Sequence, residues 1–122
     1  MSIDNQVLDF IHKRFPNAVN SDANWLHGNC YYFALILKDR FPENSDIYYD
    51  VTNGHFVCKI EDYLFDASGI YYKLNKQENS ILDSSALNYF IKLEYGITVV
   101  KWNRFNHYDS LQQVRIERDC LQ

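Results

Sequence analysis

The stretch GNCYYFALILKDRF, residues 28–41, decides the fold that we expect for this chain of 122 residues. Apolar residues recur in it at helical spacing, at Cys30, Phe33, Leu37 and Phe41. Most of the remaining helix surface is apolar as well, and a helix that is apolar on nearly all sides is buried at the centre of a domain. We therefore expect a central helix from Cys30 to Phe41, with the small residues before it placing the thiol of Cys30 at its first turn.

An amphipathic helix is expected before this central one. Ser2 is placed to cap a helix that runs to about Phe15, and Pro16 ends it because the residue before a proline avoids helical geometry. The segment from Asn17 to Asn29 is rich in residues that favour turns by bonding to their own backbone. We expect it to be a loop that leads into Cys30.

Three short runs of β-branched and aromatic residues follow the central helix. They cover residues 47–51, 54–60 and 63–67, and they are separated by Asn53-Gly54 and Glu61-Asp62. Runs of this length joined by short turns are typical of consecutive antiparallel strands. We expect three strands here.

The rest of the chain is expected to add a strand between two helices. A third helix, capped by Asp83 or Ser84, is expected to run to Tyr95, with Gly96 at its left-handed end. We expect a fourth strand over residues 97–102 and a last helix near the C-terminus.

These elements predict an α+β protein with one domain over residues 1–122. Its length and its 47% content of hydrophobic residues are sufficient for a single core. We expect the central helix to pack on a small antiparallel sheet of about four strands, with flanking helices.

The charge balance and the termini narrow the choice of partners. The net charge of -4 offers no electrostatic footprint for nucleic acid. No apolar segment approaches the roughly 20 residues that span a bilayer, and the N-terminus lacks the pattern of a signal peptide. Three cysteines cannot all pair within one chain. We therefore expect a cytoplasmic protein with reduced thiols and with no nucleic acid or membrane partner, and secretion by a specialised machine stays open.

Three residue types with linked chemistry follow one another as Cys30, His55 and Asp66. If Glu61-Asp62 is a two-residue hairpin turn, paired positions keep a constant sum, and His55 and Asp66 fall on one face as diagonal neighbours. An odd loop or a bulge would send Asp66 to the opposite face. The apolar helix is the natural cover for the His55 face, which would place the thiol of Cys30 beside the imidazole.

This order of residues predicts nucleophilic chemistry. A helix N-terminus and a neighbouring imidazolium stabilise a thiolate, so Cys30 is the expected nucleophile and His55 the base. Asp66 would orient the ring of His55, and the backbone amide of Cys30 would donate to an oxyanion. The candidates for a second oxyanion donor lie in the preceding loop: Asn24, Trp25 and His27.

The residues around the thiol resemble the nucleophile motif of the transglutaminase-like and papain-like cysteine enzyme superfamily. Transglutaminases carry a Gly-x-Cys-aromatic-x-Phe-Ala stretch, which residues 28–34 match, and papain-like proteases carry a Gln where this chain has Asn24. The family's His and Asp on adjacent strands are similar to His55 and Asp66. The resemblance covers a catalytic-type core of about residues 24–69, and it implies a papain-like or transglutaminase-like core that acts through a thioester.

Other interpretations of the same residues stay open. Cys30 on an apolar helix is also typical of a small core residue, and His55 and Asp66 are also typical turn residues. A zinc site competes, because His27 and Cys30, and again His55 and Cys58, are spaced as metal ligands. It is disfavoured because His55 and Cys58 are an odd number of positions apart on a strand and point to opposite faces.

We therefore expect a small cysteine enzyme that acts on an amide or other acyl bond of a protein or peptide substrate, without a cofactor. Hydrolysis as a protease, deamidation and transglutaminase-like acyl transfer are the possible outcomes. The alternative is a regulatory binding protein on the same fold that has no catalysis and engages a protein partner.

Overall fold

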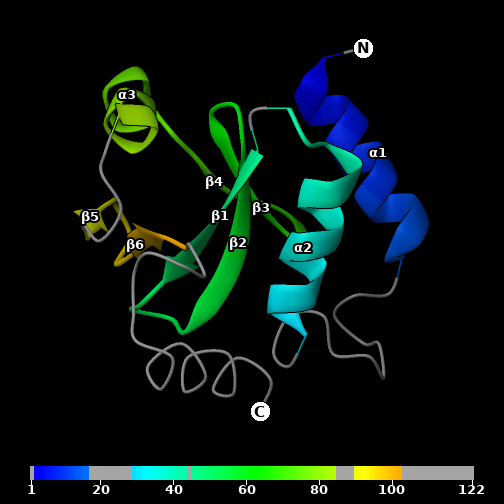
Figure 1. Ribbon diagram of the computed structural model, residues 1–122, viewed down its shortest axis with the longest axis horizontal. Coiled ribbons are helices and arrows are strands. Elements are labelled where there is room, and N and C mark those ends of the chain that lie inside the picture. Colours follow the sequence, from blue (N-terminus) through cyan, green and yellow to red (C-terminus); the bar gives the residue numbers. More distant parts are fainter. Residues whose placement is uncertain (1, 17–28, 44, 85–89, 103–122) are drawn as a thin grey trace.

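The computed structural model describes residues 2–16, 29–43, 45–84 and 90–102. Within these ranges the elements follow in the order α1 (Ile3–Arg14), α2 (Cys30–Arg40), β1 (Ser45–Asp50), β2 (His55–Ile60), β3 (Tyr63–Asp66), β4 (Gly69–Lys73), α3 (Lys76–Ser84), β5 (Ile91–Lys92) and β6 (Thr98–Lys101) (Figure 1). Among the described helices, none has the length and apolar content to cross a membrane.

The strands form one curled antiparallel sheet in the order β4-β3-β2-β1-β6-β5. The four strands β1 to β4 are a meander, in which each strand pairs with the next along the chain, and β6 then pairs with the free side of β1. The α+β class is therefore confirmed. The expected sheet of about four strands is too small, because β4 and β5 add an edge on each side.

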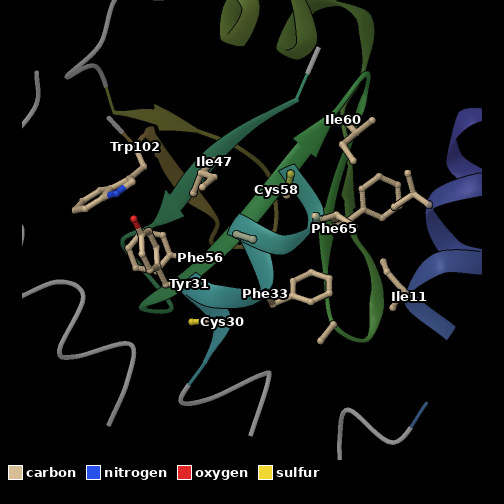
Figure 2. Packing of buried hydrophobic residues seen from close by; sticks show 14 of the residues in the cluster. Ile11, Cys30, Tyr31, Phe33, Ile47, Phe56, Cys58, Ile60, Phe65 and Trp102 are labelled. Carbon is tan, nitrogen blue, oxygen red and sulfur yellow. The ribbon is translucent and has the colours of Figure 1, made fainter. Parts of the chain in front are cut away.

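The first two helices confirm the helical spacing of the sequence. α1 buries Val7 and Ile11, which are one turn apart. α2 buries five of its eleven residues and packs mainly on β2 and β1. The expected burial on nearly all sides is wrong, because Tyr32 and Leu35 are exposed. Figure 2 shows the aromatic side chains of this layer, with Phe33 and Phe65 between α2 and α1. We call the layer between these helices and the sheet the helix-side core.

A second apolar layer covers the other face of the sheet, and we call it the α3-side core. Tyr48, Val57 and Leu64 come to it from β1, β2 and β3, and Leu82 comes from α3. The hydroxyl of Tyr48 donates a hydrogen bond of 3.1 Å to the backbone carbonyl of Leu82. The sheet is therefore buried on both faces, as its two partly apolar faces predict.

The expected third helix is wrong in its position. Instead of beginning near Asp83, α3 ends there, and it begins at a capping box formed by Asn75 and Glu78. The backbone N–H of Glu78 donates to Oδ1 of Asn75 at 2.8 Å, and the backbone N–H of Asn75 donates to Oε1 of Glu78 at 3.0 Å. The pattern Asn-x-x-Glu is a helix start signal that the sequence analysis did not use.

The residues expected to end that helix instead form β5 and a turn. Ile91 and Leu93 pack into the α3-side core together with Ile97, which follows the turn. Gly96 has a φ of 73°, so its left-handed conformation is confirmed, but it closes the β5–β6 turn and does not end a helix. The loop expected over residues 17–28 and the last helix near the C-terminus lie outside the described residues.

Candidate functional site

The β2–β3 hairpin has the turn that the sequence predicts. Ile60 pairs with Tyr63 and Cys58 pairs with Phe65, so Glu61-Asp62 is a two-residue turn. Glu61 takes a φ of 54°, a left-handed conformation that tight hairpin turns require. The even length of the turn keeps the predicted register.

This register brings His55 and Asp66 together. Nε2 of His55 lies 3.1 Å from Oδ2 of Asp66, and both residues are buried. The other carboxylate oxygen of Asp66 accepts hydrogen bonds from the backbone N–H and the hydroxyl of Ser68. Burial by itself would raise the pKa of Asp66, but the hydrogen bonds from His55 and Ser68 outweigh it and hold the pKa below its usual value. Asp66 is therefore held in the ionised form.

The pair belongs to a larger polar network that the sequence analysis missed. The ring of Tyr71 lies 5.2 Å from the ring of His55, centre to centre. The hydroxyl of Tyr71 donates a hydrogen bond of 2.7 Å to Oδ2 of Asp50, which is completely buried. Burial raises the pKa of Tyr71, and the carboxylate of Asp50 raises it further, so the phenol stays protonated.

Asp50 also closes the turn between β1 and β2. Its Oδ1 accepts the backbone N–H groups of Thr52 at 3.0 Å and Asn53 at 3.3 Å, and its Oδ2 accepts the side-chain amide of Asn53 at 2.7 Å. An Asp that accepts the N–H two residues later is a recognised turn motif, and this is the signal in the sequence that could have found it. We call Asp50, Asn53, His55, Asp66, Ser68 and Tyr71 the polar network.

Cys30 does not lie on the side of the sheet that the sequence predicts. It begins α2, is 1% exposed and belongs to the helix-side core with Phe56 and Cys58 (Figure 2). His55 alternates with Phe56 along β2, so its side chain leaves the strand on the opposite face. The expectation that α2 covers the His55 face is wrong. α2 packs instead on the face that carries Phe56 and Cys58.

The sulfur of Cys30 is also committed to a bond. Cys30 is disulfide-bonded, whereas Cys58 is a free cysteine in the helix-side core. Burial raises the pKa of the Cys58 thiol to about 12, so this thiol stays protonated at neutral pH. The expectation of reduced thiols is therefore wrong for Cys30. A sulfur in a disulfide cannot act as a thiolate nucleophile until the bond is reduced.

The structure describes only some of the remaining candidate residues. The oxyanion candidates Asn24, Trp25 and His27 lie outside the described residues. Of the two zinc-type pairs, His55 and Cys58 leave β2 on opposite faces. Within the described ranges, no group of three or more His, Cys, Asp or Glu residues is arranged to hold a metal ion.

Comparison with known proteins corrects the resemblance drawn from the motif around Cys30. The family whose model matches is described as Phage YunG-like protein, and the match covers residues 7–105. No curated protein and no solved structure matches the chain. Membership of the transglutaminase-like and papain-like superfamily is therefore wrong, and so is a cysteine protease or transglutaminase triad of Cys30, His55 and Asp66. Because the match spans most of its length, the chain belongs to the Phage YunG-like protein family.

Proposed function

We propose that this protein acts by binding another protein and not by thiol chemistry. The observation that carries the proposal is the place of Cys30, which is 1% exposed and packs on the opposite face of the sheet from His55. A nucleophile must be reduced, reachable and within hydrogen-bond reach of its base. Cys30 meets neither of the last two conditions.

The polar network supports the same proposal, because its geometry is that of a structural cross-link. Asp50, His55, Asp66 and Tyr71 come from β1, β2, β3 and β4, one residue from each strand of the meander. Each carboxylate is satisfied by donors from the protein itself. Buried polar groups that are fully paired rigidify a fold and specify its register.

The surface offers apolar side chains that a partner could cover. Tyr95 is 87% exposed and holds a φ of 61°, a left-handed conformation that costs a residue with a Cβ about 1 kcal/mol. Exposed aromatic residues are enriched where proteins meet. Further large apolar residues are exposed on several elements: Tyr32, Leu35, Val51, Ile70, Ile81 and Phe90.

Crosslinking in the native cellular setting tests the proposal. The family description names phages, so the partner is sought in a phage-infected bacterium. The tagged chain is crosslinked there with a short amine-reactive reagent, and crosslinked peptides are identified by mass spectrometry. We expect one protein to be crosslinked at a reproducible position on this chain, and equally to the Cys30→Ser variant if that variant folds.

Two results would contradict protein binding. One is the absence of any reproducible crosslinked protein. The other is the steady conversion of a peptide or amide substrate by the purified chain that disappears in the Cys30→Ser variant while circular dichroism shows the fold intact.

A further inference from the structure

A hollow of about 350 Å³ lies on the surface between α1 and the end of α2. Its volume is at the small end of the range for ligand sites. Its lining residues come from α1, from the last residue of α2 and from the residue that follows it: Gln6, Asp9, Phe10, Lys13, Arg14, Arg40 and Phe41. We call it the basic hollow, because three of these side chains are cations and one is an anion.

Two of the cations make no ion pair with another described residue. Lys13 makes an ion pair of 3.0 Å with Asp9, one turn earlier on α1. Within the described part of the chain, neither Arg14 nor Arg40 makes an ion pair. The chain as a whole has a net charge of -4, so this local positive charge is not the general character of the surface.

Arg40 is held in place by aromatic rings. Its Cζ lies 4.9 Å from the centre of the Phe41 ring and 5.7 Å from the centre of the Phe10 ring, which belongs to α1. A guanidinium that stacks on rings keeps its N–H donors at its edge, where they can pair with a carboxylate or phosphate in a bidentate manner. The stacking therefore prepares Arg40 for an anion before any ligand arrives.

A structural role for these cations explains only part of the arrangement. Cations in the last turn of a helix offset the helix dipole, and both Arg14 and Arg40 are in such positions. That effect does not require Arg40 to reach across to Phe10 on the other helix. It also does not require Arg14 and Arg40 to line one hollow.

We infer that the basic hollow binds an acidic segment of the partner protein, with carboxylates paired to Arg14 and Arg40. The inference rests on the proposed function and adds to it the place and the charge of the partner. An acidic peptide fits better than a nucleic acid, because the net charge of -4 gives the chain no extended basic surface for a phosphate backbone.

Titration of the full chain with an acetylated hexaglutamate peptide tests the inference, with amide chemical shifts followed by NMR at low salt. We expect shifts that concentrate on α1 and the end of α2. The double variant Arg14→Glu/Arg40→Glu should weaken binding of the peptide by about tenfold or more. Two attractive charge contacts are lost in this variant and replaced by repulsive ones. The matched control Lys76→Glu/Lys92→Glu changes the net charge equally, uses exposed lysines elsewhere and should weaken it by about twofold or less.

Three outcomes would overturn the inference. They are equal weakening in both double variants, absence of shifts around the hollow, and a phosphate probe (pyrophosphate or a thymidine dodecamer) that displaces hexaglutamate from the hollow. The proposed function is judged separately by crosslinking with the same variants. A partner that remains crosslinked to Arg14→Glu/Arg40→Glu at full yield removes the hollow as its docking site and leaves protein binding in place.

Discussion

The register of the β2–β3 hairpin places His55 within hydrogen-bond distance of Asp66. The two-residue turn at Glu61-Asp62 fixes the pairing of β2 with β3, and this pairing puts the imidazole 3.1 Å from the carboxylate of Asp66. The bond is buried, so its loss would leave an unpaired polar group, which costs about 1–3 kcal/mol. The pair therefore contributes to stability whether or not it has any other role.

The stability of the fold should depend on pH through Asp66. Its pKa in the folded chain is below the ordinary value of 3.8, so its contribution is complete above that value and is lost as the pH falls through the folded-state pKa. Asp66→Asn should lower the free energy of unfolding by about 1–3 kcal/mol at pH 7. The difference between the wild type and this variant should shrink below about pH 4.

Urea denaturation of both chains at pH 7 and pH 3 measures this. Asp39→Asn is the control, because Asp39 is exposed, and it should change stability by less than about 0.5 kcal/mol at either pH. A loss in Asp66→Asn that is as large at pH 3 as at pH 7 would show that the charge of Asp66 is not what stabilises the network.

At the scale of elements, the β2–β3 hairpin was predictable because the lengths of its strands and turn fix its parity. The two misplaced elements, α3 and β5, had competing signals. Asp83 and Ser84 are good capping residues. The capping box at Asn75 and Glu78 satisfies two backbone groups at once, and the helix begins there instead. β4 follows β3 after the two residues Ala67 and Ser68, and no strand was predicted there.

The turn of this hairpin supplies an element-scale prediction. Glu61 has a φ of 54°, which glycine adopts without the steric penalty of a Cβ. Glu61→Gly should therefore raise the free energy of unfolding by about 0.5–1 kcal/mol. The matched variant is Asp62→Gly, at a neighbour without a positive φ, and it should lower stability by a similar amount.

Thermal denaturation of the two glycine variants beside the wild type is the measurement. If both variants lose stability equally, Glu61 does not occupy a left-handed position, and the two-residue turn and its register would have to be revised.

At the scale of the whole molecule, the sheet is packed between a helix-side core and an α3-side core. The sequence predicted that both faces are covered, because both faces of β2 carry apolar residues. It could not predict which face α2 takes, since alternation tells two faces apart without saying which helix meets which face. That single tertiary choice separates Cys30 from His55, and no local pattern records it.

The two cores should be comparably important for stability. Phe33→Ala in the helix-side core should cost about 3–5 kcal/mol and Leu82→Ala in the α3-side core about 2–5 kcal/mol, because both side chains are almost completely buried. Ile81→Ala is the control on the same helix as Leu82, and with Ile81 42% exposed it should cost less than about 1 kcal/mol.

Chemical denaturation of these three variants measures the differences. A Leu82→Ala chain that is no less stable than the Ile81→Ala chain would mean that α3 does not cover the sheet.

The proposed function depends most on the statement that Cys30 is not a nucleophile, and labelling tests it directly. The native chain, without reductant, is treated with iodoacetamide at pH 7 and the adducts are located by mass spectrometry. The experiment is repeated after mild reduction with the wild type and with His55→Ala. We predict no adduct at Cys30 in the unreduced chain and, after reduction, a rate of labelling that does not depend on His55. Rapid labelling of Cys30 in the native chain that His55→Ala slows strongly would contradict the proposal and establish an activated thiolate.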